Sequence, residues 1–419
     1  MPWALLAAGA LAMFAAASSG TTRAPFLLEM ARDLSTSLPM VANLVGATSI
    51  SWAIAGMLAG AGSDRWGRRP FLIFGPLALC GALIGISMAP SFLMVALWSV
   101  AAGGCSGMFT GVIFAETSAR VGEGQQGRAL GWVMSGQSLT LLLGVPIAAY
   151  LGAFIGWRGV NLCVGALAAG GAVFLFLTTR GRPTSARAPG SKAPSTRAAL
   201  SWPVMRLLAM GVAERVCYGL TIVYFATFLQ STYHVGLDVV AIPLAIFASG
   251  NILGTILGGQ LADRLPNRLM IFALAMLASG IAALALFGWR RSVSVSVGLG
   301  FVYVFLNAIA RPALMAGLTQ VPAHVRGTVM GWNVTCSSIG WMGAAGLGGW
   351  MLGFQGFAGF GPLTAVVATI AAGLALVKRS ADRPGGVPSG VSGGVSGGVS
   401  SGVPGGVPGG VRGGIRRAE

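Results

Sequence analysis

The chain is short of charged residues. Only 9% of its 419 residues are Asp, Glu, Lys or Arg, whereas a soluble domain carries about a quarter. Hydrophobic residues make up 55%, and the mean hydropathy is +0.78. This deficit excludes an ordinary soluble globular protein and predicts a chain that crosses a membrane many times.

Groups for catalysis or metal binding are also scarce. The two histidines, His234 and His324, lie in predicted loops on opposite sides of the membrane and cannot share a metal. The five cysteines stand singly in apolar runs, without CxxC spacing, and are expected to be small core residues. No Ser/His/Asp set or phosphate-binding loop is present. The sequence therefore predicts no enzyme, no cofactor and no metal site.

Acidic residues are few, with 10 Asp and Glu against 27 Lys and Arg, for a formal net charge of +17. The basic residues lie in predicted loops and in the tail, and none forms a basic helix face interleaved with aromatic residues. That distribution argues against a nucleic-acid partner.

Apolar runs long enough to cross a hydrocarbon core of about 30 Å occur twelve times. The predicted spans are 4–28, 38–62, 70–89, 92–116, 128–155, 157–179, 203–230, 239–262, 268–288, 293–318, 327–352 and 357–377. We expect an N-terminal six-helix bundle in 1–179, a basic cytoplasmic linker in 180–202, a C-terminal six-helix bundle in 203–378, and a disordered Gly/Val/Ser/Pro-rich tail in 379–419.

The positions of Lys and Arg predict the orientation. With both termini in the cytoplasm, 20 of the 27 basic residues fall in inner loops and the tail. The outer side holds four: Arg32, Arg158, Arg290 and Arg291. The excess of inner positive charge favours this topology, and it places the linker beside anionic lipid headgroups.

The loop after the second span repeats in the second half. Residues 60–70 read GAGSDRWGRRP, in which Gly67 allows a tight turn. Residues 259–268 read GQLADRLPNR, and a further echo relates 128–132 to 328–332. Both patterns recur after nearly the same number of residues, which indicates two similar halves in tandem.

This loop resembles the signature G-x-x-x-D-R-x-G-R-[KR] of the major facilitator superfamily. The second copy has Pro266 in place of the signature's glycine. The resemblance covers residues 1 to about 378. It implies an all-α membrane protein with twelve transmembrane helices in two pseudo-symmetric six-helix bundles, which transports by alternating access.

The resemblance also implies a cytoplasmic gate. Asp64 and Asp263 would each sit under the start of a helix in the opposite half, near residues 327 and 128. Glu116, at the inner end of the fourth span, is expected to pair with Arg65, Arg68 or Arg69, and a role as proton carrier is the alternative. The expected gate residues are Gly60, Asp64, Arg65, Gly67, Arg68, Arg69, Glu116, Asp263, Arg264 and Arg268.

Four charged residues qualify best as lying inside the membrane: Arg23, Glu214, Arg215 and Arg311. A charge at mid-bilayer costs on the order of 2.5–3.5 kcal/mol, so each needs a partner or a wet cavity. In the resembled family the first, fourth, seventh and tenth helices line the central cavity. The implied substrate cavity contains Arg23, Glu214, Arg215, Tyr218, Asn307 and Arg311, with Tyr224 and Phe225 as aromatic walls.

Each of these charges has a second interpretation. Arg23 could extend to the outer surface, and Arg311 could satisfy carbonyls freed by Pro312. Glu214 and Arg215 are about 100° apart on a helix and are expected to pair poorly with each other. Either could instead form an ion pair with another helix. As the one mid-membrane carboxylate in the sequence, Glu214 is the candidate for proton coupling.

Glycines recur every fourth residue in several spans, which predicts close packing of backbones or faces that slide. They are Gly56 and Gly60, then Gly103, Gly107 and Gly111, and finally Gly250, Gly254 and Gly258. The fifth span contains Gly144-Val145-Pro146, which resembles a loosened form of the superfamily's antiporter signature. Its departures from that signature count against drug–proton exchange.

We therefore expect a monomeric secondary transporter of the bacterial inner membrane that moves a small organic solute, with proton-coupled efflux as the leading hypothesis. Arginines in the cavity favour an anionic or partly anionic substrate. One alternative is an importer or facilitator of organic anions. The other is a membrane receptor or scaffold that kept the fold without transport.

Overall fold

The computed structural model describes residues 2–122, 125–179, 201–319 and 323–377, and every regular element in these ranges is helical. The first half contains α1 (Trp3–Thr21), η1 (Ala24–Phe26), α2 (Leu27–Asp33), α3 (Leu38–Trp66), α4 (Arg68–Met88), α5 (Phe92–Ala119), α6 (Gln126–Leu139), the π-helical turn η2 (Thr140–Gly144) and α7 (Val145–Thr178). The second half contains α9 (Trp202–Tyr233), α10 (Leu237–Arg264), α11 (Arg268–Gly288), α12 (Val293–Thr319), α13 (Ala323–Gln355), η3 (Gly356–Gly359) and α14 (Phe360–Leu376).

Ten stretches of the described chain are long and apolar enough to span a membrane. Two of them, Arg128–Thr178 and Trp332–Leu376, have 51 and 45 residues, which is enough for two crossings of about 20 residues each. The first turns at Gly156, whose φ of 65° breaks the helical path within α7. Counted in this way, the ten stretches are compatible with the twelve expected crossings.

Large apolar side chains cover the outside of these helices. Leu58, Phe154, Ile242 and Ile281 are each about 70% exposed, at 69%, 72%, 69% and 69%. Such a surface would be unfavourable in water but suits contact with lipid tails. It identifies the chain as an integral membrane protein.

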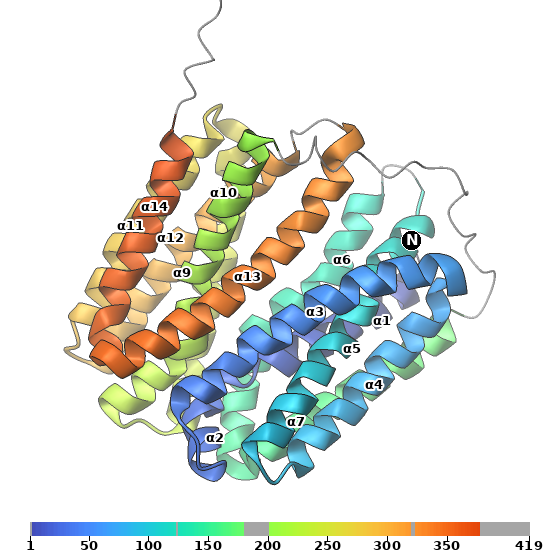
Figure 1. Cartoon of the computed structure of the whole chain (residues 1–419), viewed down its shortest axis with the longest axis horizontal. Helices are drawn as coiled ribbons and strands as arrows, with labels where there is room; N and C mark the ends of the chain where they lie inside the picture. Colours follow the sequence, from blue (N-terminus) through green and yellow to red (C-terminus); the bar gives the residue numbers. More distant parts are fainter. Residues whose placement is uncertain (1, 123–124, 180–200, 320–322, 378–419) are drawn as a thin grey trace, which may run out of the picture. The chain divides into compact units, whose positions relative to one another are not determined.

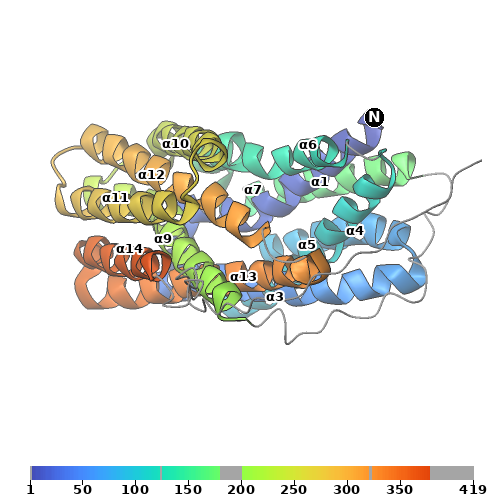
Figure 2. The same cartoon turned by 90° about the horizontal axis from the view of Figure 1, so that it is seen from above.

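The helices pack mainly within two sets, α1–α7 and α9–α14 (Figures 1 and 2). Contacts between the sets join α3 to α13 and α7 to α10. Residues up to Val377 form one compact unit, so the predicted division into two bundles stays a prediction. The predicted linker (180–202) and tail (379–419) lie outside the described residues except for Ser201 and Trp202.

Glycine brings α5 against α3 and α10 against α12. A side chain at Gly107 would overlap the backbone oxygen of Trp52, and one at Gly254 would overlap that of Phe305. The prediction of close backbone packing is confirmed at these positions. It is wrong for Gly60 and Gly111, because a side chain at either would meet nothing within 4 Å.

The predicted first span of 4–28 lies within the membrane-length stretch Trp3–Asp33, but its helix is interrupted, because α1 stops at Thr21. Pro25 then starts the short 3-10 helix η1, and α2 follows. The cysteine prediction is only partly right. Cys217 is buried, but Cys163 is exposed on the outer surface of its helix.

We call the end of the helices that carries the turns 64–69 and 264–268 the basic end. The opposite end carries the turns 34–37 and 234–236.

Candidate functional site

A buried carboxylate on α9 lies between two arginines. Glu214 is 2% exposed, and its Oε2 is 3.1 Å from Nε of Arg215 and 3.5 Å from Nη1 of Arg311. The Arg215 N–H does not point along a hydrogen bond to that oxygen, so this contact is an ion pair only. The expectation that Glu214 and Arg215 pair poorly is therefore only partly right, because they form an ion pair although this nitrogen makes no hydrogen bond. The long arginine side chain folds back along the helix and overcomes the angle between their Cα positions.

Aromatic rings hold Arg215 in place from the other side. Its guanidinium lies 4.9 Å from the ring centre of Tyr218, and Trp341 of α13 meets that ring edge-on at 5.9 Å. A cation over an aromatic face is attracted by the ring quadrupole. Gly340 lets α13 approach, because any side chain there would overlap Arg215.

Arg311 is the accessible member of the group. Its side chain is 36% exposed, against 10% for Arg215 and 2% for Glu214. Its ion pair joins α12 to α9, as one of the interpretations of Glu214 predicted, and no bond to carbonyls near Pro312 is seen among the described residues. A solute reaching this region would meet Arg311 first and Glu214 behind it.

Arg23 is buried elsewhere, just past the end of α1. It is 3% exposed, so the interpretation that it extends to the outer surface is wrong. Its Nη1 donates to the Thr48 hydroxyl at 3.3 Å, and its Nε and Nη2 are buried without a partner. Within the described chain no carboxylate pairs with it and no bond joins it to Glu214. An enclosed charge with so little compensation is costly.

Asn307 does not join the Glu214 group. It is fully buried, its Nδ2 lies 3.8 Å from Sδ of Met276 on α11, and its Oδ1 has no partner. Asn307 does lie one helical turn from Arg311. Its short side chain stays among the helices of the second set, whereas the longer Arg311 side chain extends out of them. Tyr224 is fully buried and donates to the Ala345 carbonyl at 2.9 Å.

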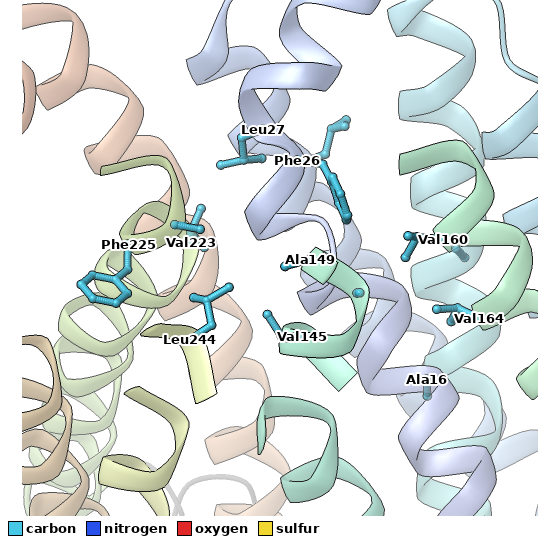
Figure 3. Packing of buried hydrophobic residues seen from close by; sticks show 14 of the residues in the cluster. Ala16, Phe26, Leu27, Val145, Ala149, Val160, Val164, Val223, Phe225 and Leu244 are labelled. Atoms are coloured by element: carbon cyan, nitrogen blue, oxygen red, sulfur yellow. The ribbon is translucent and has the colours of Figure 1, made fainter. Parts of the chain in front are cut away.

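A cavity of about 30 Å³ lies where the two helix sets meet. It has room for about one water molecule, and its walls include Leu141, Val145, Tyr218, Phe225 and Leu244. Figure 3 shows Val145 of α7 and Leu244 of α10 facing one another, with Phe225 beyond them. Tyr218 belongs both to this cavity and to the Arg215 contact, so the cavity adjoins the charged group.

The π-helical turn η2 contributes Leu141 to that cavity. Such turns widen a helix by one residue and are frequent at functional sites. The Gly144-Val145-Pro146 sequence pointed to this region, since Pro146 enters the first turn of α7 without a hydrogen-bond donor. Asn251, a polar residue within the apolar α10, also lines the cavity. Sequence reasoning missed it, although its polarity was the available signal.

At the basic end, Glu116 is 3% exposed and lies 3.5 Å from Nη1 of Arg68, one of its three expected partners. A second partner was missed: Nε of Arg120 is 2.6 Å from Glu116, one turn along α5. Arg68 and Arg120 also donate to carbonyls of Ala115 and Thr178. The group thus fastens the ends of α4, α5 and α7.

The remaining gate residues are less constrained. Gly67 has a φ of 81° in the turn between α3 and α4, as a tight turn requires. Arg69 lies 5.4 Å from the ring centre of Phe176, and Arg65 and Asp263 are exposed. The side chains of Asp64 and of residues 323–328 fall outside the described part. The expected contact of Asp64 with the helix start near 327 therefore stays a prediction.

Charged side chains buried among membrane-spanning helices are typical of transporters. The comparison with known families names the class: the model of the Major Facilitator Superfamily matches residues 9–345 and, again, 207–401. The chain belongs to this superfamily, whose members are transporters and not enzymes.

Curated relatives extend over most of the chain. It is 26% identical over 347 residues to the chloramphenicol resistance protein of Streptomyces lividans, covering 79% of this chain and 88% of that protein. It is 26% identical over 355 residues to the inner membrane transport protein YdhP of Escherichia coli O157:H7, covering 83% and 88%. It is 24% identical over 310 residues to the purine ribonucleoside efflux pump NepI of Escherichia coli O6:K15:H31, covering 70% and 77%.

Solved structures agree on the fold. A bacterial homologue of the human lysosomal transporter Spinster, in an inward-facing and unoccupied conformation, superposes with a TM-score of 0.74 at 17% identity, covering 89% of this chain and 96% of that one.

Proposed function

We propose that the protein is a secondary transporter that exports a small organic solute across the bacterial inner membrane, coupled to protons, by alternating access between its two helix sets. The observation that carries the proposal is Glu214, buried on α9 and paired with Arg215 and with Arg311 of α12. An intramembrane carboxylate in such a position is a candidate proton and solute site. Relatives named for resistance and for efflux support export.

The solute would bind to two sites on the chain, Glu214 and Arg23. Glu214 accepts hydrogen bonds, so a donor group of the solute, such as a hydroxyl, amine or amide N–H, would bind there in place of a proton. Among the described residues Arg23 has unused donors and no carboxylate partner, so an anionic group would bind there. A partly anionic solute with donor groups fits both sites, and competition between solute and proton for Glu214 gives exchange.

The basic end would face the cytoplasm, with both termini on that side. Arginines of the turns at 64–69 and 264–268 lie there, in keeping with the excess of positive charge in cytoplasmic loops. The contacts between helix sets near Gly46 and Met342, and between Gln230 and the Pro25 carbonyl at 2.8 Å, lie toward the opposite end. We infer that this end closes the path to the outside.

Arg311 supports a second candidate, an importer of organic anions. If Glu214 takes up a proton, Arg311 loses its partner and becomes free for an anion. Proton and anion would then bind together rather than compete, which is the linkage of a symporter. The third possibility, a receptor or scaffold without transport, would leave these charges without a use.

Everted membrane vesicles distinguish these functions. Candidate solutes come from a thermal-shift screen of the purified protein against carboxylates, nucleobases, sugars and lipophilic cations. We expect a stabilising solute to accumulate in everted vesicles when their interior is made acidic. Loss of solute under the same gradient would identify the importer, and stabilisation by lipophilic cations alone would contradict the anionic site. A solute that raises the melting temperature and crosses in neither direction would identify the receptor.

A further inference from the structure

A second, larger cavity opens at the basic end, outside the Glu214 group. Its volume is about 570 Å³, and it lies between the start of α9, the turn from α10 to α11, and α12. Three arginines and one carboxylate line it, together with Asn267 and Gly317. The charged residues are Arg206, Arg264, Arg268 and Asp263.

The cavity carries positive charge that the described residues do not neutralise. Arg206 donates from Nη1 to the Val377 carbonyl at 2.6 Å, and its Nε is buried without a partner. Arg268 donates from Nε to the Ala262 carbonyl at 3.1 Å. Within the described chain no ion pair joins Asp263 to any of the three arginines. Asn267 caps α11, so the positive end of a 21-residue helix adds to the same region.

The first half of the chain shows what completes such a site. There, in the repeated turn, Arg68 is neutralised by the buried carboxylate of Glu116 on α5. The matching stretch of α12, residues 313–319, reads ALMAGLT and contains no acidic residue. The repeat aligns Arg68 with Asn267, so the second half lacks both members of that pair, while Arg264 and Arg268 of its turn remain beside the cavity. An anion from outside the chain would neutralise these arginines.

We propose that this cavity binds a phosphate group, supplied by the headgroup of an anionic membrane lipid. The guanidinium group of arginine can donate two parallel hydrogen bonds to phosphate oxygens. Basic pockets between transmembrane helices bind the headgroups of anionic lipids. The cavity lies where the apolar surface ends: Trp202, beside it on α9, is 58% exposed, and Leu265, in its rim, is 46% exposed. Tryptophan is typical of the membrane interface, which favours a lipid over phosphate in solution.

The test uses the intact protein in a neutral detergent. Binding is measured by calorimetry for short-chain phosphatidylglycerol, short-chain phosphatidylcholine and inorganic phosphate. We expect phosphatidylglycerol to bind most tightly, and Arg264→Gln to weaken it about fivefold, since each arginine near such a headgroup contributes on that scale. Arg65→Gln is the matched control, because it removes the equivalent arginine of the first turn, where α5 supplies Glu116. It should leave binding unchanged.

A second pair of variants separates charge from shape. Gly317 lines the cavity, and a side chain there would meet only Leu207, at 3.5 Å. Gly317→Glu places a carboxylate among the arginines and should abolish lipid binding, while Gly317→Gln, of equal size, should retain it. Inorganic phosphate binding as tightly as the lipid, with the same response to Gly317→Glu, would keep the phosphate site and move its source to the solution. Equal binding of both lipids, or equal binding by the two Gly317 variants, would overturn the proposal.

Discussion

At the scale of single residues, the structure sets a compensated charge against an uncompensated one. Glu116 is buried with two arginines around it, whereas Arg23 is buried with one hydroxyl as its partner in the described part of the chain. A buried ion without a counter-ion is unfavourable for stability. Since we propose that Arg23 binds the solute, we expect the two sites to respond to mutation in opposite directions.

Replacing Arg23 should stabilise the protein and harm transport. Arg23→Met keeps the apolar length and removes the uncompensated charge, so the free energy of unfolding should rise by roughly 1 to 3 kcal/mol. Solute affinity should fall at the same time, because the anion loses its donor. Thermal melts in detergent, with and without solute, measure both effects, and the exposed Arg32→Met serves as control. A lower melting temperature for Arg23→Met would show that its charge is satisfied.

Glu116→Gln should have the opposite effects: it should destabilise the protein and leave solute binding unchanged. It leaves Arg68 and Arg120 facing a neutral amide, and both arginines are partly exposed, at 21% and 23% of their side chains. We therefore expect a loss of about 2 kcal/mol, below the 3 to 5 typical of fully buried pairs. Solute binding by the folded fraction should stay at its wild-type value. Weakened solute binding in that fraction would instead favour the alternative role of Glu116 in coupling.

At the scale of helices, the two pairs α3–α5 and α10–α12 depend on glycine. Gly107 and Gly254 face a carbonyl oxygen of the neighbouring helix with no room for a methyl group. The two helix pairs correspond under the repeat, but the glycine lies on α5 in the first half and on α10 in the second. Small residues at such crossings allow the van der Waals contact that drives helix association in lipid.

Gly107→Ala should therefore destabilise the protein by about 1 to 3 kcal/mol, because α5 must move away from Trp52. Gly111→Ala, one turn further on, meets open space and should be neutral or slightly stabilising, since alanine favours a helix over glycine. Their melting temperatures under identical conditions provide the comparison. Equal values for the two variants would mean that the helices adjust freely at this crossing.

The helices themselves could be predicted from the sequence, while their interruptions could not. Runs of apolar residues bounded by charged turns gave α4, α11 and α12 to within two residues of their ends. The break after α1 was not predicted, because hydropathy continues through Pro25 although the helix does not. The turn η2 was not predicted, since its extra residue depends on packing against α1 rather than on composition.

The residues of the candidate site could be predicted from the sequence, but the contacts between them could not. Charges in apolar spans stand out in any sequence, so Glu214, Arg215 and Arg311 were identified. Their mutual pairing depends on side-chain length and on neighbours from other helices, such as Trp341, that no local pattern shows.

At the scale of the whole molecule, the proposed cycle requires α3 and α13 to separate at the end opposite the arginine-rich turns. A Cβ at Gly46 would lie 3.5 Å from that of Met342, which suits a disulfide. The variant Gly46→Cys/Met342→Cys, with the five native cysteines replaced, should stop transport on oxidation and recover it on reduction. Either single cysteine is the control. Full transport by the oxidised double variant would exclude a cycle in which these helices part.

Glu214 is the centre of the account, and proton flux tests it most directly. In proteoliposomes loaded with a pH-sensitive dye, the wild-type protein should move protons when a gradient of its solute is imposed. Glu214→Gln should exchange labelled for unlabelled solute across the membrane while moving no protons. Proton movement by Glu214→Gln equal to that of the wild type would show that the carboxylate between Arg215 and Arg311 has no part in coupling.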